Sequence, residues 1–211
     1  MTLTDMRALV RRDLHDEDES DYRWMDNELD RHIARAVKEF SEAVPLEQKA
    51  TLATTIGSRE ITIAGLTNRV MVEAIEYPTD KFPKSYQRFA LWNETITLLG
   101  EDIPNGSNCF IYYGKLHILD GSNSTIPSKY EDLVVTGADG YAAFEGSIYA
   151  VNHVNAGGRG TVEEFKALAN DHLIRFRAEL KRLSRKNRVR SSQLYIPYEA
   201  VVSKSTDGGP Y

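Results

Sequence analysis

Cysteine is almost absent from this 211-residue sequence, and long apolar runs are missing altogether. The single cysteine, Cys109, excludes a disulfide within the chain and a cysteine-rich metal site, and it favours a reducing compartment. No apolar stretch approaches the roughly 20 residues that a membrane-spanning helix needs. The first residues, Met1–Asp5, lack a charged segment followed by an apolar one, so we expect no signal peptide.

Residue patterns that carry chemistry are also missing. No two of the five histidines are spaced four residues apart, and neither a His-Glu-x-x-His nor a Gly-x-Ser-x-Gly pattern occurs. We therefore expect no enzymatic activity, no metal and no cofactor. His172 lies near an apolar helical stripe and is expected to be a satisfied core or interface residue. Cys109 is expected to be a small buried side chain rather than a nucleophile.

Two short segments resemble ligand-binding loops, and each departs from its motif. Asp16-x-Asp18-x-Ser20 could begin a calcium loop, but the required glycine and bidentate glutamate are replaced by Asp21 and Asn27. A solvated acidic loop or a contact between subunits is favoured instead. The segment Gly157–Thr161 could hold a phosphate at a helix N-terminus. Because a helix rather than a strand precedes it, a flexible interhelical turn is favoured.

Charge is distributed unevenly along the chain. The net charge of −5 argues against general binding of polyanions. The acids gather near the N-terminus: Asp13, Asp16, Glu17, Asp18, Glu19, Asp21, Asp26, Glu28 and Asp30. Against one acid, Glu179, eight cations gather near the C-terminus: Arg175, Arg177, Lys181, Arg182, Arg185, Lys186, Arg188 and Arg190. This asymmetry suits head-to-tail contact between copies, or one pairing within the chain.

Apolar spacing predicts four helices. The first covers residues 4–14, with Thr4 as its N-cap, and the second begins at Asp26 and is ended by Pro45. Capping boxes at Ser128-x-x-Glu131 and Thr161-x-x-Glu164 open the third and fourth helices. The third helix contains Gly137, Gly140 and Gly146, which suggest either a close approach of another helix or a kink.

Between about residues 47 and 120 the apolar period drops to two, which predicts strands. Six or seven short strands are expected, as in a small antiparallel sandwich or barrel. Residues 51–56 and 60–63 read as a hairpin, and Gly114 reads as a tight turn between two strands within residues 110–119. The other predicted strands cover residues 70–75, 86–92 and 95–99.

The predicted fold class is therefore α+β. An antiparallel four-helix bundle is formed by residues 1–45 and 126–186. A small antiparallel β module, residues 46–125, is inserted between helices two and three. An extended C-terminal arm, residues 187–211, follows the last helix.

This order of parts resembles the head–tail connector (adaptor or neck) proteins of tailed bacteriophages. Three segments carry the resemblance. They are Leu3–Phe40, with Met6-Arg7-x-x-Val10-Arg11-Arg12 and Arg23-Trp24-x-Asp26-x-Glu28-Leu29; Ile126-Pro127-x-x-Tyr130-x-x-Leu133-Val134 with the small-residue helix Ala138–Phe144; and the helix Phe165–Leu183 with its arm. The resemblance implies a ring, commonly of twelve copies, beneath the portal at the capsid vertex, with the genome passing through its channel.

The expected partners follow from that resemblance. They are other copies in a ring, the portal protein, a downstream tail or neck protein, and genome DNA that passes through without sequence-specific binding, with no membrane. The protein is expected in the virion neck after assembly in the host cytoplasm. The resemblance suggests portal docking by the arm region: Arg182, Arg185, Lys186, Arg188, Arg190, Leu194, Tyr195, Ile196 and Tyr198.

The basic helix end has three interpretations. It can be a solvated terminus favoured by the helix dipole, a nucleic-acid-binding surface, or a contact with an acidic partner. The apolar segment Leu194–Tyr198 that follows it favours the partner, because apolar and aromatic anchors are typical of interface cores. A nucleic-acid-binding module and a different neck or tail-completion protein remain the alternative functions.

Overall fold

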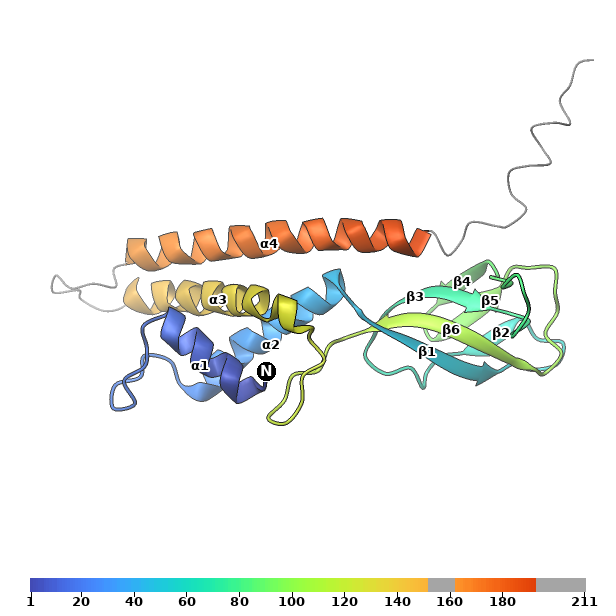
Figure 1. Cartoon of the computed structure of the whole chain (residues 1–211), viewed down its shortest axis with the longest axis horizontal. Helices are drawn as coiled ribbons and strands as arrows, with labels where there is room; N and C mark the ends of the chain where they lie inside the picture. Colours follow the sequence, from blue (N-terminus) through green and yellow to red (C-terminus); the bar gives the residue numbers. More distant parts are fainter. Residues whose placement is uncertain (152–161, 193–211) are drawn as a thin grey trace, which may run out of the picture. The chain divides into compact units, whose positions relative to one another are not determined.

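The computed structural model describes residues 1–151 and 162–192, with side chains for residues 1–150 and 162–188. The chain divides into two compact units. A helical unit contains residues 1–46 and 116–184, and a β unit is built on residues 47–115. Figure 1 shows the order of elements, with α1 and α2 before the strands and α3 and α4 after them. None of the described helices is long and apolar enough to cross a membrane.

Helix α1 (Leu3–Asp13) begins at a reciprocal cap. Thr2 Oγ1 accepts a hydrogen bond from the backbone N–H of Asp5 at 3.2 Å, and the Asp5 carboxylate accepts one from the Thr2 N–H at 2.8 Å. Two backbone donors that a helix start leaves unpaired are thereby satisfied. The cap is therefore Thr2, two residues before the predicted Thr4.

Helix α2 (Asp26–Ala43) follows a loop and ends two residues before Pro45. The Glu28 carboxylate accepts a hydrogen bond from the backbone N–H of Met25 at 2.7 Å, which secures its start. Its apolar stripe, with Leu29, Ile33 and Phe40 among the fully buried side chains, faces the core of the helical unit.

A 3-10 turn, η1 (Ser128–Tyr130), leads into α3 (Glu131–Val151), and α4 (Val162–Ser192) lies along α3 (Figure 1). Glycine permits this approach. A Cβ atom on Gly137 would stand 2.8 Å from the ring of Phe176, and one on Gly140 would stand 2.8 Å from Leu173. Of the two predicted roles for these glycines, close approach of another helix is the one observed.

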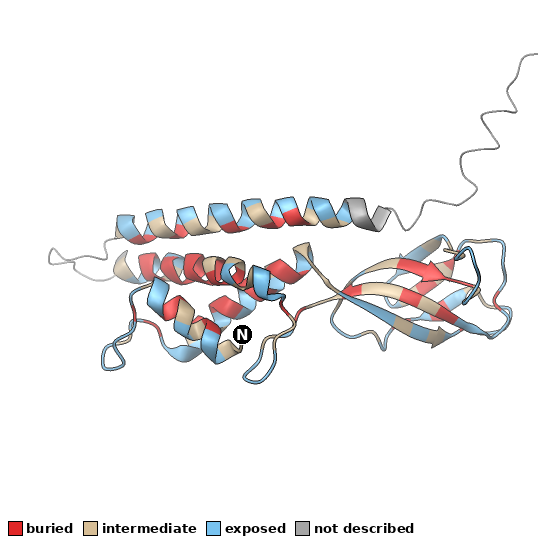
Figure 2. Cartoon of the chain, viewed as in Figure 1, coloured by how far each residue is buried: buried red, intermediate tan, exposed pale blue. Residues whose placement is uncertain are grey.

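The core of the helical unit draws on all four helices. Figure 2 shows buried positions concentrated on α3 and on the sides of α1, α2 and α4 that face the interior. Trp24, in the α1–α2 loop, is also buried, and its ring meets Phe165 of α4 edge-on at 6.1 Å between centroids. The loop is thus tied to the start of α4 by aromatic packing.

The β unit holds six strands in two sheets. Strands β1 (Leu46–Ala53), β6 (Asn108–Lys115) and β3 (Arg69–Glu76) form one sheet in the order β1-β6-β3. Strands β2 (Glu60–Thr62), β5 (Thr95–Leu98) and β4 (Phe89–Trp92) form the other, in the order β2-β5-β4. Both sheets contribute to one apolar cluster that includes Ile61, Ile75, Ile96 and Ile111, and Cys109 is buried in it as predicted.

Two predicted hairpins are wrong. The segments expected to pair as residues 51–56 and 60–63 belong to different sheets, because β1 lies beside β6 and β2 pairs with β5. Gly114 is not a turn, because β6 continues through it and pairs antiparallel with β3, with Ile111 opposite Ile75. Alternation of apolar residues identifies strands but does not select their partners.

The predicted fold class, a four-helix bundle with one small antiparallel β module, is also wrong. Helix α1 has 11 residues and α4 has 31. At about 1.5 Å per residue they span roughly 16 and 46 Å, so they cannot form a bundle of matched helices. The six strands form two three-stranded sheets rather than one. Helix α4 continues to Ser192, so residues 187–192, expected in an extended arm, are helical.

Candidate docking surface and its supporting network

The C-terminal half of α4 presents a basic surface. Phe176, Leu180 and Leu183 are buried, and their spacing of three and four residues places the cations on the remaining faces of the helix. Figure 2 shows exposed positions recurring along α4. The exposed cations of this half are Arg175, Arg177, Lys181, Arg182, Arg185, Lys186 and Arg188.

Part of this charge is already paired. Arg175 lies 3.0 Å from Asp171, and Arg182 lies 2.5 Å from Glu179, each one helical turn away. Burial raises the pKa of the Tyr141 hydroxyl on α3, and the nearby Arg177 opposes that shift. Within the part of the chain that the structure describes, no ion pair involves the other four cations: Lys181, Arg185, Lys186 and Arg188. We call these four the free cations of α4.

The predicted docking residues divide into three groups. Arg182, Arg185, Lys186 and Arg188 are exposed on α4. Arg190 belongs to α4, but its side chain lies outside the described residues, as do Leu194, Tyr195, Ile196 and Tyr198. The helix places Arg182, Arg185 and Lys186 on adjoining positions of one face, since residues three and four apart are neighbours on a helix. The loop Gly157–Thr161 also lies outside the described residues.

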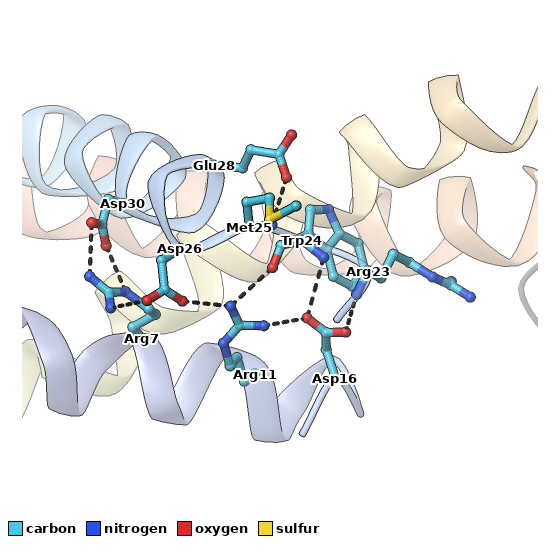
Figure 3. A network of polar contacts seen from close by, with 9 residues as sticks. All are labelled: Arg7, Arg11, Asp16, Arg23, Trp24, Met25, Asp26, Glu28 and Asp30. Atoms are coloured by element: carbon cyan, nitrogen blue, oxygen red, sulfur yellow. Dashed lines mark hydrogen bonds and ion pairs between the residues drawn. The ribbon is translucent and has the colours of Figure 1, made fainter. Parts of the chain in front are cut away.

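A buried arginine joins α1 to the start of α2 (Figure 3). The Arg11 guanidinium, 6% exposed, donates to Asp16 at 2.6 Å, to the backbone carbonyl of Trp24 at 3.0 Å and to Asp26 at 2.7 Å. The other Asp16 oxygen accepts the backbone N–H of Arg23 at 2.7 Å. The α1–α2 loop is therefore held at both ends by one cation and one carboxylate.

Arg7 extends this network by one helical turn. It binds Asp30 through two nitrogens at 2.9 and 2.8 Å, and it reaches Asp26 at 2.7 Å (Figure 3). Hydrogen bonding to Arg11, with the charge of Arg7 nearby, lowers the pKa of Asp26. Bidentate arginine–carboxylate pairs hold both direction and distance. We call Arg7, Arg11, Asp16, Asp26 and Asp30 the N-terminal clamp.

Sequence reasoning missed this clamp. Asp16 was considered as a calcium-loop residue, but its carboxylate is occupied by Arg11 and by backbone N–H groups. Among the described residues, no group of three or more potential ligands is arranged to hold a metal ion. A usable signal was present, because Arg7 and Arg11 are four residues apart and so are Asp26 and Asp30. Matched spacing on neighbouring helices brings two such pairs face to face.

A buried aspartate and a half-buried histidine join α3 to α4. His172 Nδ1 lies 3.7 Å from a carboxylate oxygen of Asp139, which is too long for a hydrogen bond. Within the described residues, neither that nitrogen nor the other Asp139 oxygen has a hydrogen-bond partner, so His172 is not a satisfied core residue there, and its expected alternative as an interface residue stays a prediction. Burial raises the pKa of Asp139 to about 6, with Asp13 adding to the shift. The nearby Asp139 carboxyl raises the pKa of His172, which Asp171 and Arg175 also influence.

The SU10 adaptor protein family matches residues 1–197, a range that takes in the clamp, both units and all of α4. The chain belongs to this family. SU10 adaptors are head–tail adaptors of phages, so the predicted resemblance to connector proteins is confirmed. No curated protein matched the chain.

Family membership defines a phage adaptor with a structural role, found in the virion and in contact with other virion proteins. The features described above are consistent with a structural part. The clamp and the buried core fix the helical unit, and the free cations of α4 are exposed. The match ends at residue 197, within the predicted apolar anchor Leu194–Tyr198.

Proposed function

We propose that this adaptor forms a ring, dodecameric by analogy with connector proteins, that docks on the portal. The ring extends the DNA channel and provides the platform to which the next tail or neck protein attaches. It works in the virion neck after assembly in the host cytoplasm, without catalysis and without sequence-specific contact to the genome. Family membership supports the adaptor role from which this proposal starts.

One observation carries the docking part of the proposal. The free cations of α4 lie within eight residues, and five residues separate the last of them, Arg188, from the apolar segment Leu194–Tyr198. Exposed charges without internal partners favour encounter with a surface of opposite sign, and apolar anchors supply the buried centre of an interface. The proposed portal contacts are Arg182, Arg185, Lys186, Arg188, Arg190, Leu194, Tyr195, Ile196 and Tyr198.

Charge reversal tests this surface. In the test variant, Arg185, Lys186 and Arg188 are replaced by glutamate, and binding to purified portal rings is measured by surface plasmon resonance over a salt series. The control variant carries Lys81→Glu, Arg88→Glu and Lys129→Glu, three exposed cations outside α4, so both variants have the same net charge. We expect the test variant to bind at least tenfold more weakly and the control to stay within threefold of the unmodified protein. Equal losses in both variants would contradict docking through α4.

Ring formation is tested separately. Native mass spectrometry of the protein alone and with portal rings gives its copy number in each condition. We expect rings in at least the second condition. A protein that stays monomeric in both conditions would rule out the connector function.

Exposed cations on α4 also suit a nucleic-acid-binding module, which is the second candidate function. Four cations neutralising four phosphates would give a slope of about −4 in a plot of log affinity against log salt concentration. A filter-binding assay on duplex DNA measures that slope. Weak binding with a shallow slope favours the connector, and tight binding with a steep slope favours the nucleic-acid module.

A further inference from the structure

A buried carboxylate lies at the contact between α3 and α4, which run side by side in Figure 1. Asp139 of α3 is 1% exposed, and its Oδ1 atom has no hydrogen-bond partner within the described residues. Its Oδ2 atom faces His172 of α4, whose Nδ1 atom is 3.7 Å away and equally unpaired there. Folded proteins rarely leave a buried polar group unpaired, because its lost hydration is then not replaced.

Apart from His172, the charged groups that the structure places around Asp139 do not offset its burial. Asp13, which approaches from α1, bears the same charge and adds to the rise in the pKa of Asp139. On α4, Asp171 and Arg175 lie near His172, but they pair with each other at 3.0 Å. The titratable groups of α2 that face α3 contact other residues: Arg31 and His32 contact Glu145, and Arg35 and Glu39 contact Tyr141.

Apolar packing holds α4 against α3 despite this pair. Phe176, Leu180 and Leu183 of α4 are buried. The joint between α1 and α2 is different, because the N-terminal clamp supplies it with satisfied ion pairs. Opening the α1–α2 joint breaks those ion pairs, whereas opening the α3–α4 contact returns an unpaired carboxylate to water. Of these two contacts, the one between α3 and α4 is therefore the one whose polar groups favour release.

We propose that Asp139 and His172 form a proton-dependent latch, which lets α4 be released from α3 while α1, α2 and α3 stay folded. This inference goes beyond the proposed function and holds whether or not the chain forms rings. Folded proteins open locally in cooperative units, and the elements that move are drawn from the less stable ones. A released α4 re-aims the exposed cations of its C-terminal half while the clamp still fixes α1 and α2.

Protonation closes the latch. Burial raises the pKa of Asp139 from 3.8 to about 6, so the closed state binds its proton more tightly than the open state does. The contribution of Asp139 to closure is therefore lost as pH rises from about 4 to 7. That of His172, whose pKa is raised above 6.5 by the nearby Asp139 carboxyl, is lost only at higher pH. The shift of Asp139 alone corresponds to a rise of roughly 50-fold in the opening constant between pH 4 and 7.

Hydrogen–deuterium exchange of the full-length protein, followed by mass spectrometry, tests the latch. It gives an opening constant for each helix after correction for the pH dependence of intrinsic exchange. Peptides from residues 173–183 report on α4, and peptides from residues 29–40 report on α2 as a reference for unfolding of the whole helical unit. At pH 7 we expect the opening constant of α4 to exceed that of α2 at least tenfold. Between pH 4 and 7 we expect the α4 constant to rise about 50-fold.

Two isosteric variants separate the latch from other carboxylates of the helical unit. Asp139→Asn removes the titrating group, so its α4 opening constant should change less than fivefold between pH 4 and 7. Glu42→Gln removes an exposed carboxylate of α2 and is the matched control, so it should keep the full pH dependence.

Three outcomes would overturn the proposal. Equal opening constants for α4 and α2 would mean that α4 leaves α3 only when the whole helical unit unfolds, and the unmodified protein gives this result without any variant. A pH dependence that Asp139→Asn retains would assign the titrating group to another residue. An α4 opening constant that falls as pH rises would reverse the sign of the latch.

Discussion

Replacing the buried Arg11 by alanine should destabilise the helical unit far more than replacing an exposed arginine of the same helix. Arg11 is 6% exposed and donates three hydrogen bonds, to Asp16, Asp26 and the carbonyl of Trp24. Its removal leaves the Asp16 carboxylate buried without a counter-charge. Asp26 is affected less, because its side chain is 57% exposed and Arg7 still reaches it.

The expected loss in the free energy of unfolding follows from the burial of the Arg11–Asp16 pair. Breaking a buried ion pair by removing one partner costs about 3–5 kcal/mol, because the remaining charge is left uncompensated. Asp16 keeps the backbone N–H of Arg23, so the lower end of that range, about 3 kcal/mol, applies here. For a chain of this size 1 kcal/mol corresponds to about 2–4 °C, so the melting temperature should fall by roughly 6–12 °C.

Tryptophan fluorescence can follow the helical unit alone. Trp24 is 4% exposed within the helical unit, whereas Trp92, in the β unit, is 86% exposed. In a Trp92→Phe background, urea unfolding monitored at Trp24 therefore reports on the unit that contains Arg11. Arg12→Ala is the matched control, because Arg12 is exposed and its contact with Asp13 is 3.6 Å long. It should cost less than about 0.5 kcal/mol.

The result that would refute this reasoning is a loss for Arg11→Ala within 1 kcal/mol of that for Arg12→Ala. A double variant, Arg11→Met with Asp16→Leu, adds a second check. Replacing both members of a buried pair by apolar side chains is often neutral or stabilising. The double variant should therefore be more stable than Arg11→Ala.

Three further predictions concern α3 and α4. Because burial raises the pKa of Asp139 to about 6, folding favours its protonated form, and this contribution to stability is lost as pH rises from about 4 to 7. The contribution of His172, whose pKa is raised above 6.5, is lost only at higher pH. Relative to Asp139→Asn, the unmodified protein should lose up to about 3 kcal/mol in urea unfolding between pH 4 and 7, and parallel pH curves would contradict this. Gly137→Ala should destabilise the helical unit by about 1–3 kcal/mol in the same urea assay, because a Cβ would stand 2.8 Å from the buried ring of Phe176. A neutral or stabilising effect would count against the close approach of α3 and α4. A chain truncated after Asn187 should keep its helical circular dichroism but lose portal binding, and normal docking would remove the role given to the C-terminal segment.

Helix positions were predictable from sequence, and helix packing was not. Apolar spacing located the four described helices, because it acts over a few residues. The predicted end signals did less well: the cap of α1 is Thr2 rather than Thr4, and the turn at Ser128 has no side-chain cap. The spacing does not specify how many helices share a core or how long each remains in contact. The spacing therefore predicts a regular bundle, although α1 has 11 residues and α4 has 31.

Strand pairing failed for a similar reason. Judged from its sequence neighbours alone, Gly114 is expected to form a turn. In the structure it lies within β6, opposite Met71 and near a register shift in the pairing of β6 with β3. An isolated glycine inside a strand pattern is as consistent with a bulge as with a turn. Only the partner strand distinguishes the two, and sequence neighbours carry no information about it.

The acids of the N-terminal region fall into two groups, those paired within the helical unit and those exposed. Asp16, Asp26 and Asp30 belong to the first group, because Arg7 and Arg11 neutralise them, so they do not add to a surface for head-to-tail contact. Glu17, Asp18, Glu19 and Asp21 remain exposed on the loop that the clamp fixes.

The surface charge offered to partners is therefore smaller and more localised than the sequence count suggests. Of the charges that the sequence places near the two ends, an acidic loop held by a buried arginine and the four free cations of α4 stay exposed in the part of the chain that the structure describes. Exposed charges of this kind are screened within about 8–10 Å at physiological salt, so they act mainly on encounter rates and orientation. Tight assembly needs apolar contacts as well, and exposed apolar side chains such as Phe144 and Ile148 and the segment Leu194–Tyr198 are the kind of residues that supply them. Adding salt should therefore slow ring assembly and portal docking far more than it speeds their dissociation, as stopped-flow mixing can measure, and a salt effect confined to dissociation would contradict this division of roles.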